Sequence, residues 1–210
     1  MNNIKISAII TSGGNSTRFG SNKLLEKIND KTVIETTISK FLDLVDEIII
    51  PSSEEIQSFL LKSDLFCEKI KFAHAGKTRQ KSVYNGINKA NNPKIILIHD
   101  GARPFIEKET IKKAIDLTFE KQAVLVGTMA IDTIKEVKDG VIIKTLDRKN
   151  IFQAQTPQCF DFQLIKKIHE HYKNEENFTD DSSMAEAYGV KVYILEGLKT
   201  NKKITTREDL

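Results

Sequence analysis

Short runs of β-branched and aliphatic residues alternate along this chain with longer stretches in which apolar residues recur at helical spacing. This alternation indicates βα units, because a strand buried on both faces is apolar throughout, whereas a covering helix is apolar along one stripe. We therefore predict a three-layer α/β/α fold with a mostly parallel, twisted sheet, whose ligands bind at the carboxyl ends of the strands. The expected strands are 4–11, 46–52, 69–76, 94–100, 122–131 and 191–197.

The stretches between these runs predict amphipathic helices. One helix begins near Thr32, because Lys31–Thr32 can cap the first turn. A similar pattern covers 161–172. The buried face predicted for the first of these helices consists of Val33, Ile34, Thr37, Ile38, Phe41 and Leu42.

One segment departs from the βα alternation. Residues 131–148 have period-two character on both sides of Asp139–Gly140, which is a strong signal for a two-residue hairpin turn. We predict a projecting β-arm over about 131–154. An isolated hairpin is marginal in water, so the arm either covers an edge of its own sheet or contacts another subunit.

The composition limits which kinds of protein this chain can be. The chain has 210 residues, 40% of them hydrophobic, and no linker or repeat, so we expect one domain over 1–210. No apolar run approaches the ~20 residues that span a bilayer, and the first residues lack a signal-peptide pattern, so we expect a cytoplasmic protein. The net charge of +3 is too mild for a nucleic-acid-binding protein. Cys67 and Cys159 lack metal-ligand spacing and are expected to be reduced thiols.

The first predicted strand leads into "TSGGNSTRFGSNKLL", Thr11 to Leu25, which is rich in glycine and hydroxyl residues. Backbone N–H groups in such a loop can approach a phosphate closely. The stretch is neither the dinucleotide fingerprint nor a P-loop, since Lys23 is followed by Leu24. Arg18 and Lys23 add two positive charges, which suit a triphosphate that loses pyrophosphate. A tight turn without a ligand is the alternative.

Later loops add polar groups at the same predicted edge of the sheet. Gly76, Arg79 and Ser82 follow one strand, where backbone groups and a hydroxyl could read a flat base. Asp100 and Arg103 follow the next strand. Asp100 can accept from ligand hydroxyls or bind Mg²⁺, and Arg103 can hold a phosphate. A purely structural Asp–Arg pair is the alternative.

Two further segments, 152–160 and 177–189, combine hydroxyls with acids or amides. Either segment can also be a plain helix cap. In the second, Thr179 or Asp180 would start a helix that Gly189 ends.

Taken in order from Ile4 to Leu210, these segments resemble the 2-C-methyl-D-erythritol 4-phosphate cytidylyltransferase family of the non-mevalonate isoprenoid pathway. The resemblance implies a Rossmann-like nucleotidyltransferase domain that uses CTP, a sugar-alcohol phosphate and Mg²⁺. It also implies a homodimer that exchanges its β-arms. The motifs beyond the Gly-rich loop are "R-x-x-S-V-x-x-G" from Arg79, "HDGARPF" from His99, "DTIK" from Asp132, "QTPQ-x-F" from Gln155, "TDD" from Thr179 and "NKKITTREDL" at the end.

The resemblance further implies roles for individual residues. The nucleotide would be bound by Ser12, Gly13, Gly14, Ser16, Gly76, Arg79, Ser82, Asp100 and Gly101. The transition state would be stabilised by Arg18, Lys23 and Lys203. The sugar-phosphate side would be served by Asp100, Arg103, Thr133, Arg148, Thr156 and Thr179, with Thr133 and Arg148 acting in the neighbouring subunit's site.

No nucleophilic side chain is needed for this reaction, because a phosphate dianion already attacks well. Accordingly we expect His99 to support the loop around Asp100, and His169 and His171 to face solvent.

Departures from the family pattern leave alternatives open. Ser16 stands where a second glycine is common, and the loop before Lys23 is about two residues shorter, so the reach of Lys23 can differ. Sister enzymes that make CDP-ribitol share the fold and the CTP chemistry, but "NFTDDSSMAE" and Ala102 favour methylerythritol phosphate. Molybdenum-cofactor guanylyltransferases share the short loop but lack "HDGARPF". A non-catalytic nucleotide-binding module is the alternative from another class.

Overall fold

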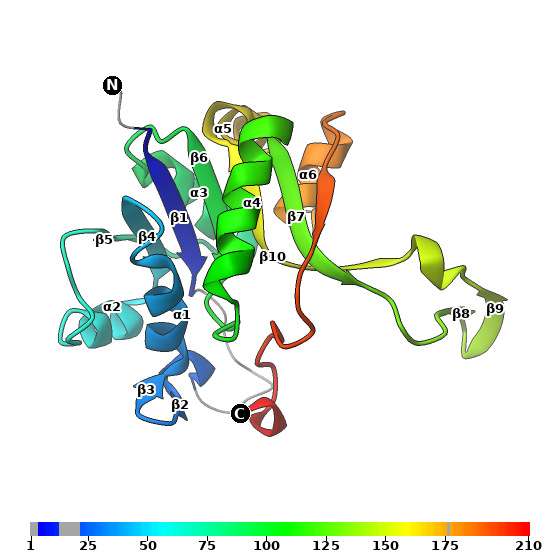
Figure 1. The fold of residues 1–210 in the computed structure, drawn as a ribbon, viewed down its shortest axis with the longest axis horizontal. Helices are drawn as coiled ribbons and strands as arrows, with labels where there is room; N and C mark the ends of the chain where they lie inside the picture. The colour runs from blue at the N-terminus through cyan, green and yellow to red at the C-terminus, as the bar shows by residue number, and fades with distance from the viewer. Residues whose placement is uncertain (1–3, 13–21, 176) are drawn as a thin grey trace.

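A seven-stranded sheet forms the centre of the computed structural model, which describes residues 4–12, 22–175 and 177–210 (Figure 1). The strand order is β11-β7-β10-β6-β1-β4-β5. All of these strands run parallel except β10, which is antiparallel to both of its neighbours. Their bounds are β1 (Ile6–Thr11), β4 (Glu47–Ser52), β5 (Ile70–His74), β6 (Ile95–Asp100), β7 (Ala123–Met129), β10 (Phe152–Asp161) and β11 (Tyr193–Glu196).

Helices cover both faces of this sheet, so the predicted three-layer α/β/α fold is confirmed. Side chains alternate between the layers: Leu97 of β6 packs in one core and its neighbour Ile98 in the other. The first core packs against α1 (Val33–Phe41), α2 (Glu54–Leu60) and α4 (Lys108–Lys121). The second packs against α3 (Arg79–Lys89), α5 (Phe162–His171) and α6 (Asp181–Ala187).

Local sequence signals set the ends of these helices. Thr32 caps α1 through a capping box with Glu35, as the sequence predicts. Asp180 caps α6, and Gly189 just beyond its end has a φ of +86°, a conformation that glycine adopts without strain. Among the described residues, no helix is long and apolar enough to cross a bilayer. Cys67 and Cys159 are both free thiols.

Strand β10 is the element that the sequence pattern missed. Its first half is polar and it contains Pro157, which argues against a central strand. The structure accommodates Pro157 because the register between β10 and β7 shifts between Ala154 and Gln158, so this stretch is not part of the regular ladder. The expected β-arm of 131–154 therefore overlaps the start of a central strand.

The predicted hairpin forms from β8 (Lys135–Lys138) and β9 (Val141–Thr145). Asp139 and Gly140 have φ values of 50° and 80°, as a two-residue turn with both central residues left-handed requires. The arm projects from the body of the molecule and forms a two-stranded sheet of its own, so it does not cover an edge of the main sheet (Figure 1). Short elements complete the described chain: η1 (Lys23–Leu25), β2 (Lys27–Ile28), β3 (Lys31–Thr32), η2 (Arg148–Asn150) and η3 (Arg207–Asp209).

Candidate active site

Several of the residues singled out in the sequence lie together at the carboxyl ends of β1 and β6. These strands pair in parallel with Thr11 opposite Asp100, so the loops that follow them leave the sheet side by side. Gly101 donates its N–H to the carbonyl oxygen of Thr11 at 2.9 Å. A Cβ at Gly101 would lie 2.8 Å from that same oxygen, so the close approach of the two loops requires glycine.

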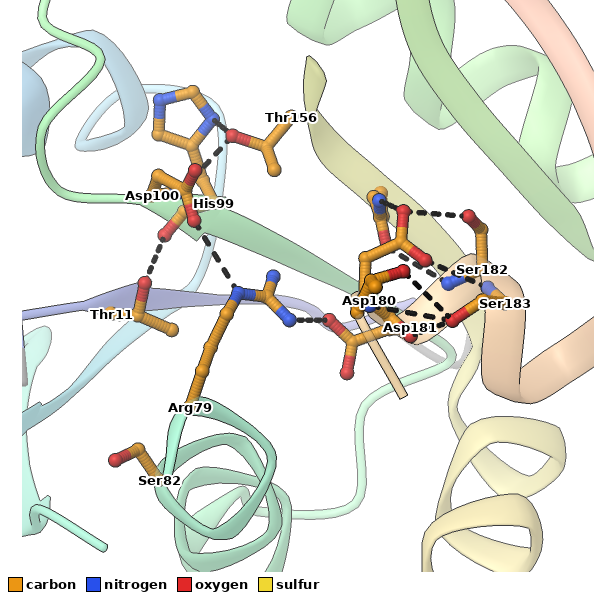
Figure 2. Close-up of polar contacts among 12 residues, drawn as sticks. Thr11, Arg79, Ser82, His99, Asp100, Thr156, Asp180, Asp181, Ser182 and Ser183 are labelled. Carbon is orange, nitrogen blue, oxygen red and sulfur yellow. Dashed lines mark hydrogen bonds and ion pairs between the residues drawn. The ribbon is translucent and has the colours of Figure 1, made fainter. Parts of the chain in front are cut away.

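Asp100 is the centre of a cluster of charges. Its Oδ2 lies 2.9 Å from Lys203 Nζ and 3.4 Å from Arg103 Nε. Its Oδ1 lies 3.5 Å from Arg79 Nε (Figure 2). Burial by itself would raise the pKa of Asp100, but the charges of Lys203, Arg79 and Arg103 outweigh burial and hold that pKa well below its usual range. The carboxylate is therefore ionised and holds three cations, of which Arg79 and Lys203 come from distant parts of the chain.

The C-terminal segment is fastened to this cluster. Arg103 Nη1 donates to the carbonyl oxygen of Asn201 at 2.8 Å, and the backbone N–H of Ile204 donates to the carbonyl oxygen of Ala102 at 2.8 Å. Lys23 Nζ donates to the carbonyl oxygen of Ile204 at 2.8 Å. These contacts bring Lys23 and Lys203, two of the predicted catalytic cations, to one short segment of the chain.

His99 and Thr156 brace the loop around Asp100. The carbonyl oxygen of Arg103 can only accept, so His99 Nε2, 3.1 Å away, carries the proton of the neutral ring. Burial lowers the pKa of His99 to about 4, which keeps the ring neutral. His99 Nδ1 then accepts from Thr156 Oγ1 at 3.0 Å, and Thr156 Oγ1 accepts from the backbone N–H of Asp100 (Figure 2). The expected support of this loop by His99 is confirmed.

The turn from β5 into α3 is equally constrained. Gly76 donates its N–H to Ser82 Oγ at 2.9 Å, and Ser82 Oγ donates to the carbonyl oxygen of Thr78. A Cβ at Gly76 would lie 2.5 Å from Lys81 Cβ, so a larger residue cannot occupy this turn unchanged. Ser12 Oγ, after β1, donates to the carbonyl oxygen of Pro51 at 2.8 Å, so its proton is directed toward β4.

Asp181 also contacts the site residues, although no individual role was predicted for it. Arg79 Nη1 lies 2.7 Å from Asp181 Oδ2, and His169 Nε2 lies 2.9 Å from Asp181 Oδ1. The prediction that His169 faces solvent is wrong: its side chain is 1% exposed, because α6 packs over this face of α5. His171, two residues later, is exposed as predicted. The second Asp of "TDD" was the available signal for Asp181.

Other predicted residues lie apart from the cluster. Thr179 is exposed and contacts Ser183. Thr133 and Arg148 lie at the base of the arm, where Arg148 donates to the carbonyl oxygen of Ile131. Within the described part of the chain, no hydrogen bond or ion pair joins Thr133 or Arg148 to Asp100. Four predicted residues lie outside the described residues: Gly13, Gly14, Ser16 and Arg18.

The site offers one carboxylate, that of Asp100, as a protein ligand for a divalent cation. The described residues contain no group of three or more His, Cys, Asp or Glu side chains arranged to hold a metal. Mg²⁺ in enzymes that act on nucleotides is commonly held by one or two carboxylates together with substrate phosphates. Asp100 fits that pattern as one carboxylate ligand.

Comparison with known proteins agrees with this geometry. The family model for IspD, 2-C-methyl-D-erythritol 4-phosphate cytidylyltransferase, matches residues 6–210. The chain belongs to this family. A relative of the same name from Clostridium botulinum is 44% identical, with 98% of this chain and 96% of the relative covered. One from Clostridioides difficile is 40% identical, with 97% and 90% covered.

Solved structures of family members also match. The 4-diphosphocytidyl-2C-methyl-D-erythritol synthase of Anaerococcus prevotii superposes with a TM-score of 0.87 at 30% identity, covering 98% of this chain and 92% of that one. The Francisella tularensis cytidylyltransferase superposes with a TM-score of 0.84 at 30% identity, covering 98% and 96%. The resemblance found in the sequence is thus confirmed, and the chain is a nucleotidyltransferase of the cytidylyltransferase class.

Proposed function

We propose that this chain transfers the cytidylyl group of CTP to 2-C-methyl-D-erythritol 4-phosphate, giving 4-diphosphocytidyl-2-C-methyl-D-erythritol and pyrophosphate at the carboxyl ends of β1 and β6. Membership of the family supports the reaction. The observation that carries the location is the buried Asp100 carboxylate, which holds Arg79, Arg103 and Lys203 at one point of the sheet edge. Three cations gathered there suit two phosphorylated substrates.

The chemistry requires positioning and charge stabilisation. An oxygen of the methylerythritol phosphate attacks the α-phosphorus of CTP in line, the bond to the β-phosphate oxygen breaks, and pyrophosphate leaves. The attacking phosphate is already an anion, so no side chain has to remove a proton. Lys23, Arg18 and Lys203 stabilise the negative charge that builds on the reacting phosphoryl group and on the leaving group. The Lys23–Ile204 hydrogen bond supports Lys23 and Lys203 acting together.

The nucleotide is recognised mainly by backbone and hydroxyl groups in this proposal. The Gly-rich loop after β1 cradles the phosphates, and the turn between β5 and α3 forms the cytosine and ribose pocket. The crowding at Gly76 and Gly101 against the chain's own atoms supports a fixed backbone path around this pocket. The residues assigned to the nucleotide are Ser12, Gly13, Gly14, Ser16, Gly76, Arg79, Ser82, Asp100 and Gly101.

Mg²⁺ is the proposed cofactor, held by the phosphates of CTP and by Asp100. The ion would neutralise charge on the triphosphate. Arg103, Thr156 and Thr179 are assigned to the sugar-phosphate side; of these, Arg103 and Thr156 are held around Asp100 in the structure.

We also propose a homodimer that forms through the β-arm, with Thr133 and Arg148 completing the partner's site. The exposed apolar side chains of the arm support an intermolecular contact, because Val137, Val141 and Ile142 are each more than half exposed.

One domain over 1–210 and a cytoplasmic location remain predictions, which limited proteolysis and cell fractionation can test.

Pyrophosphate release from CTP and Mg²⁺ tests the function. We expect release with methylerythritol 4-phosphate and none with ribitol 5-phosphate or with CTP alone. If only ribitol 5-phosphate gave release, the assignment of the active site would stand, but the acceptor substrate would be ribitol 5-phosphate. If CTP stabilised the fold but neither sugar phosphate were turned over, the protein would be a nucleotide-binding module, and the proposed enzyme activity would be wrong.

A further inference from the structure

A buried chain of contacts runs from Arg79 to α6 and α5. Arg79 bridges two carboxylates, Asp100 at 3.5 Å and Asp181 at 2.7 Å (Figure 2). Asp181 in turn contacts His169 at 2.9 Å. Asp181 and His169 are each 1% exposed, so these contacts are shielded from water. The guanidinium of Arg79 is therefore held in place from α6 and α5 as well as from β6.

The direction of these hydrogen bonds follows from the charges. Burial would raise the pKa of Asp181, but the charge of Arg79 and the hydrogen bond from His169 outweigh burial and lower it. An ionised carboxylate only accepts, so His169 donates from Nε2 to Oδ1 while Arg79 donates to Oδ2. Without the donor from His169, one oxygen of this buried carboxylate would lose its partner.

The other nitrogen of the imidazole is buried, and His169 and Gln80 both line one small hollow. His169 Nδ1 and Gln80 Oε1 are buried and have no hydrogen-bond partner among the described residues. The hollow that both residues line has a volume of about 10 Å³, which is the lower limit for holding one water molecule. The amide of Gln80 is fixed, because its Nε2 donates to the carbonyl oxygens of Tyr172 and Glu175. One water between Nδ1 and Oε1 would satisfy both atoms and fix the plane of the ring.

Packing alone does not account for a histidine at this position. His169 lies on the buried face of α5 with Phe162 and Ile165, where a leucine would fill space without burying a ring nitrogen that has no partner. The functional contact of His169 is with Asp181, which holds Arg79.

We propose that His169 is a positioning residue for CTP binding: its Nδ1 is anchored by a water shared with Gln80, its Nε2 holds Asp181, and Asp181 holds Arg79 in the nucleotide pocket. The inference rests on the proposed role of Arg79.

Steady-state kinetics of three variants test the inference. His169→Leu removes the donor at similar volume and should raise KM for CTP about tenfold, with kcat and KM for methylerythritol phosphate changed less than about twofold. His169→Gln places an amide N–H at about the distance of Nε2 and should restore KM to within about threefold of wild type. His169→Asn carries the same amide one methylene shorter, cannot reach Asp181, and should behave like His169→Leu.

Controls separate positioning from folding. His171→Leu, the same change at an exposed position two residues away, should leave all parameters unchanged. A variant that is merely less folded would lose kcat at constant KM, and thermal melting would reveal it. Equal KM for CTP in His169→Leu and wild type, or no difference between the Gln and Asn variants, would overturn the proposal.

Arg79→Met distinguishes the inference from its premise. If this variant leaves KM for CTP unchanged, the assignment of Arg79 to the nucleotide fails. If it raises KM while His169→Leu does not, only the inference about His169 fails. If the proposal holds, His169→Leu adds less than about twofold in an Arg79→Met background, because both changes interrupt one chain of contacts.

A high-resolution crystal structure tests the second anchor of the ring. We expect one ordered water within about 3.2 Å of both His169 Nδ1 and Gln80 Oε1. A direct contact between these two atoms, or a rotated ring, would overturn that part of the proposal.

Discussion

The charge cluster at the carboxyl ends of β1 and β6 and the β-arm are built in opposite ways. Asp100 is 7% exposed, and the ion pairs around it join four separate segments of the chain. In the arm every residue of β8 and β9 is exposed, up to 68% for Val141. The cluster is held by its own chain, whereas the arm has an apolar surface that only another surface can cover. Substitutions in the cluster should therefore affect chemistry, and substitutions in the arm should affect assembly.

The largest effect is expected from Asp100→Asn. This change keeps the shape but removes the charge that holds Arg79, Arg103 and Lys203, so these cations repel one another and lose their positions. We expect kcat/KM to fall at least about 100-fold in a pyrophosphate-release assay. Asp116→Asn, the same change at an exposed position on α4, is the control and should be silent. Activity within threefold of wild type for Asp100→Asn would contradict the assignment.

The next effect concerns the arm. Ile142→Asp puts a charge on an exposed apolar side chain, which should convert the dimer to a monomer because the charge would be buried in the contact. Light scattering should show half the mass, and activity should fall about tenfold, since the partner's residues leave the site. Phe119→Asp on α4, also exposed, should leave the mass unchanged. A monomeric wild-type protein with full activity would refute the proposed arm exchange.

A smaller effect, on stability alone, is expected at the amino ends of the strands, away from the proposed site. Glu47 is buried at the amino end of β4, where it accepts from Lys71 Nζ at 2.6 Å and from Ser7 Oγ at 2.7 Å. Burial would raise its pKa, but hydrogen bonds from Lys71, Ser7 and the backbone of Asn91 lower it below the ordinary 4.5. The ionised form therefore stabilises the fold above pH 4.5, and this stability is lost as the pH falls further.

Glu47→Gln should accordingly cost about 1–3 kcal/mol of unfolding free energy at pH 7 and leave kcat/KM unchanged. The difference from wild type should shrink below pH 4.5 in denaturant titrations. A stability difference that stays constant with pH would contradict the role of the ionised Glu47. A loss of catalytic activity would show that the amino ends of the strands also contribute to function.

The sequence predicted the parts of the fold that depend on local patterns. The apolar runs predicted β1, β4, β5, β6, β7 and β11, and Asp139–Gly140 predicted the hairpin, because each signal lies within a few residues. Strand β10 was missed because Pro157 and its polar neighbours are tolerated only through a register shift that involves β7. Such a shift is a property of the assembled sheet.

The site shows the same division. Gly76, Arg79 and Asp100 could be selected from their loops, but the link between Arg79 and Asp181 joins residues 102 positions apart and needs the packing of α6 against the sheet. His169 was misjudged because it was assigned with His171 to one exposed-looking helix. Its spacing from Phe162 and Ile165, seven and four residues, was the overlooked sign of burial.

Mixing two inactive variants tests most directly whether the cluster and a partner's arm form one active site. Lys203→Ala impairs the cluster but keeps the arm, and Arg148→Ala impairs the arm but keeps the cluster. After subunit exchange at equal amounts, half of the dimers are mixed and each mixed dimer has one intact site, so activity should return to about one quarter of wild type. A mixture that stays as inactive as its components would place all of these residues in the site of a single chain and contradict the account.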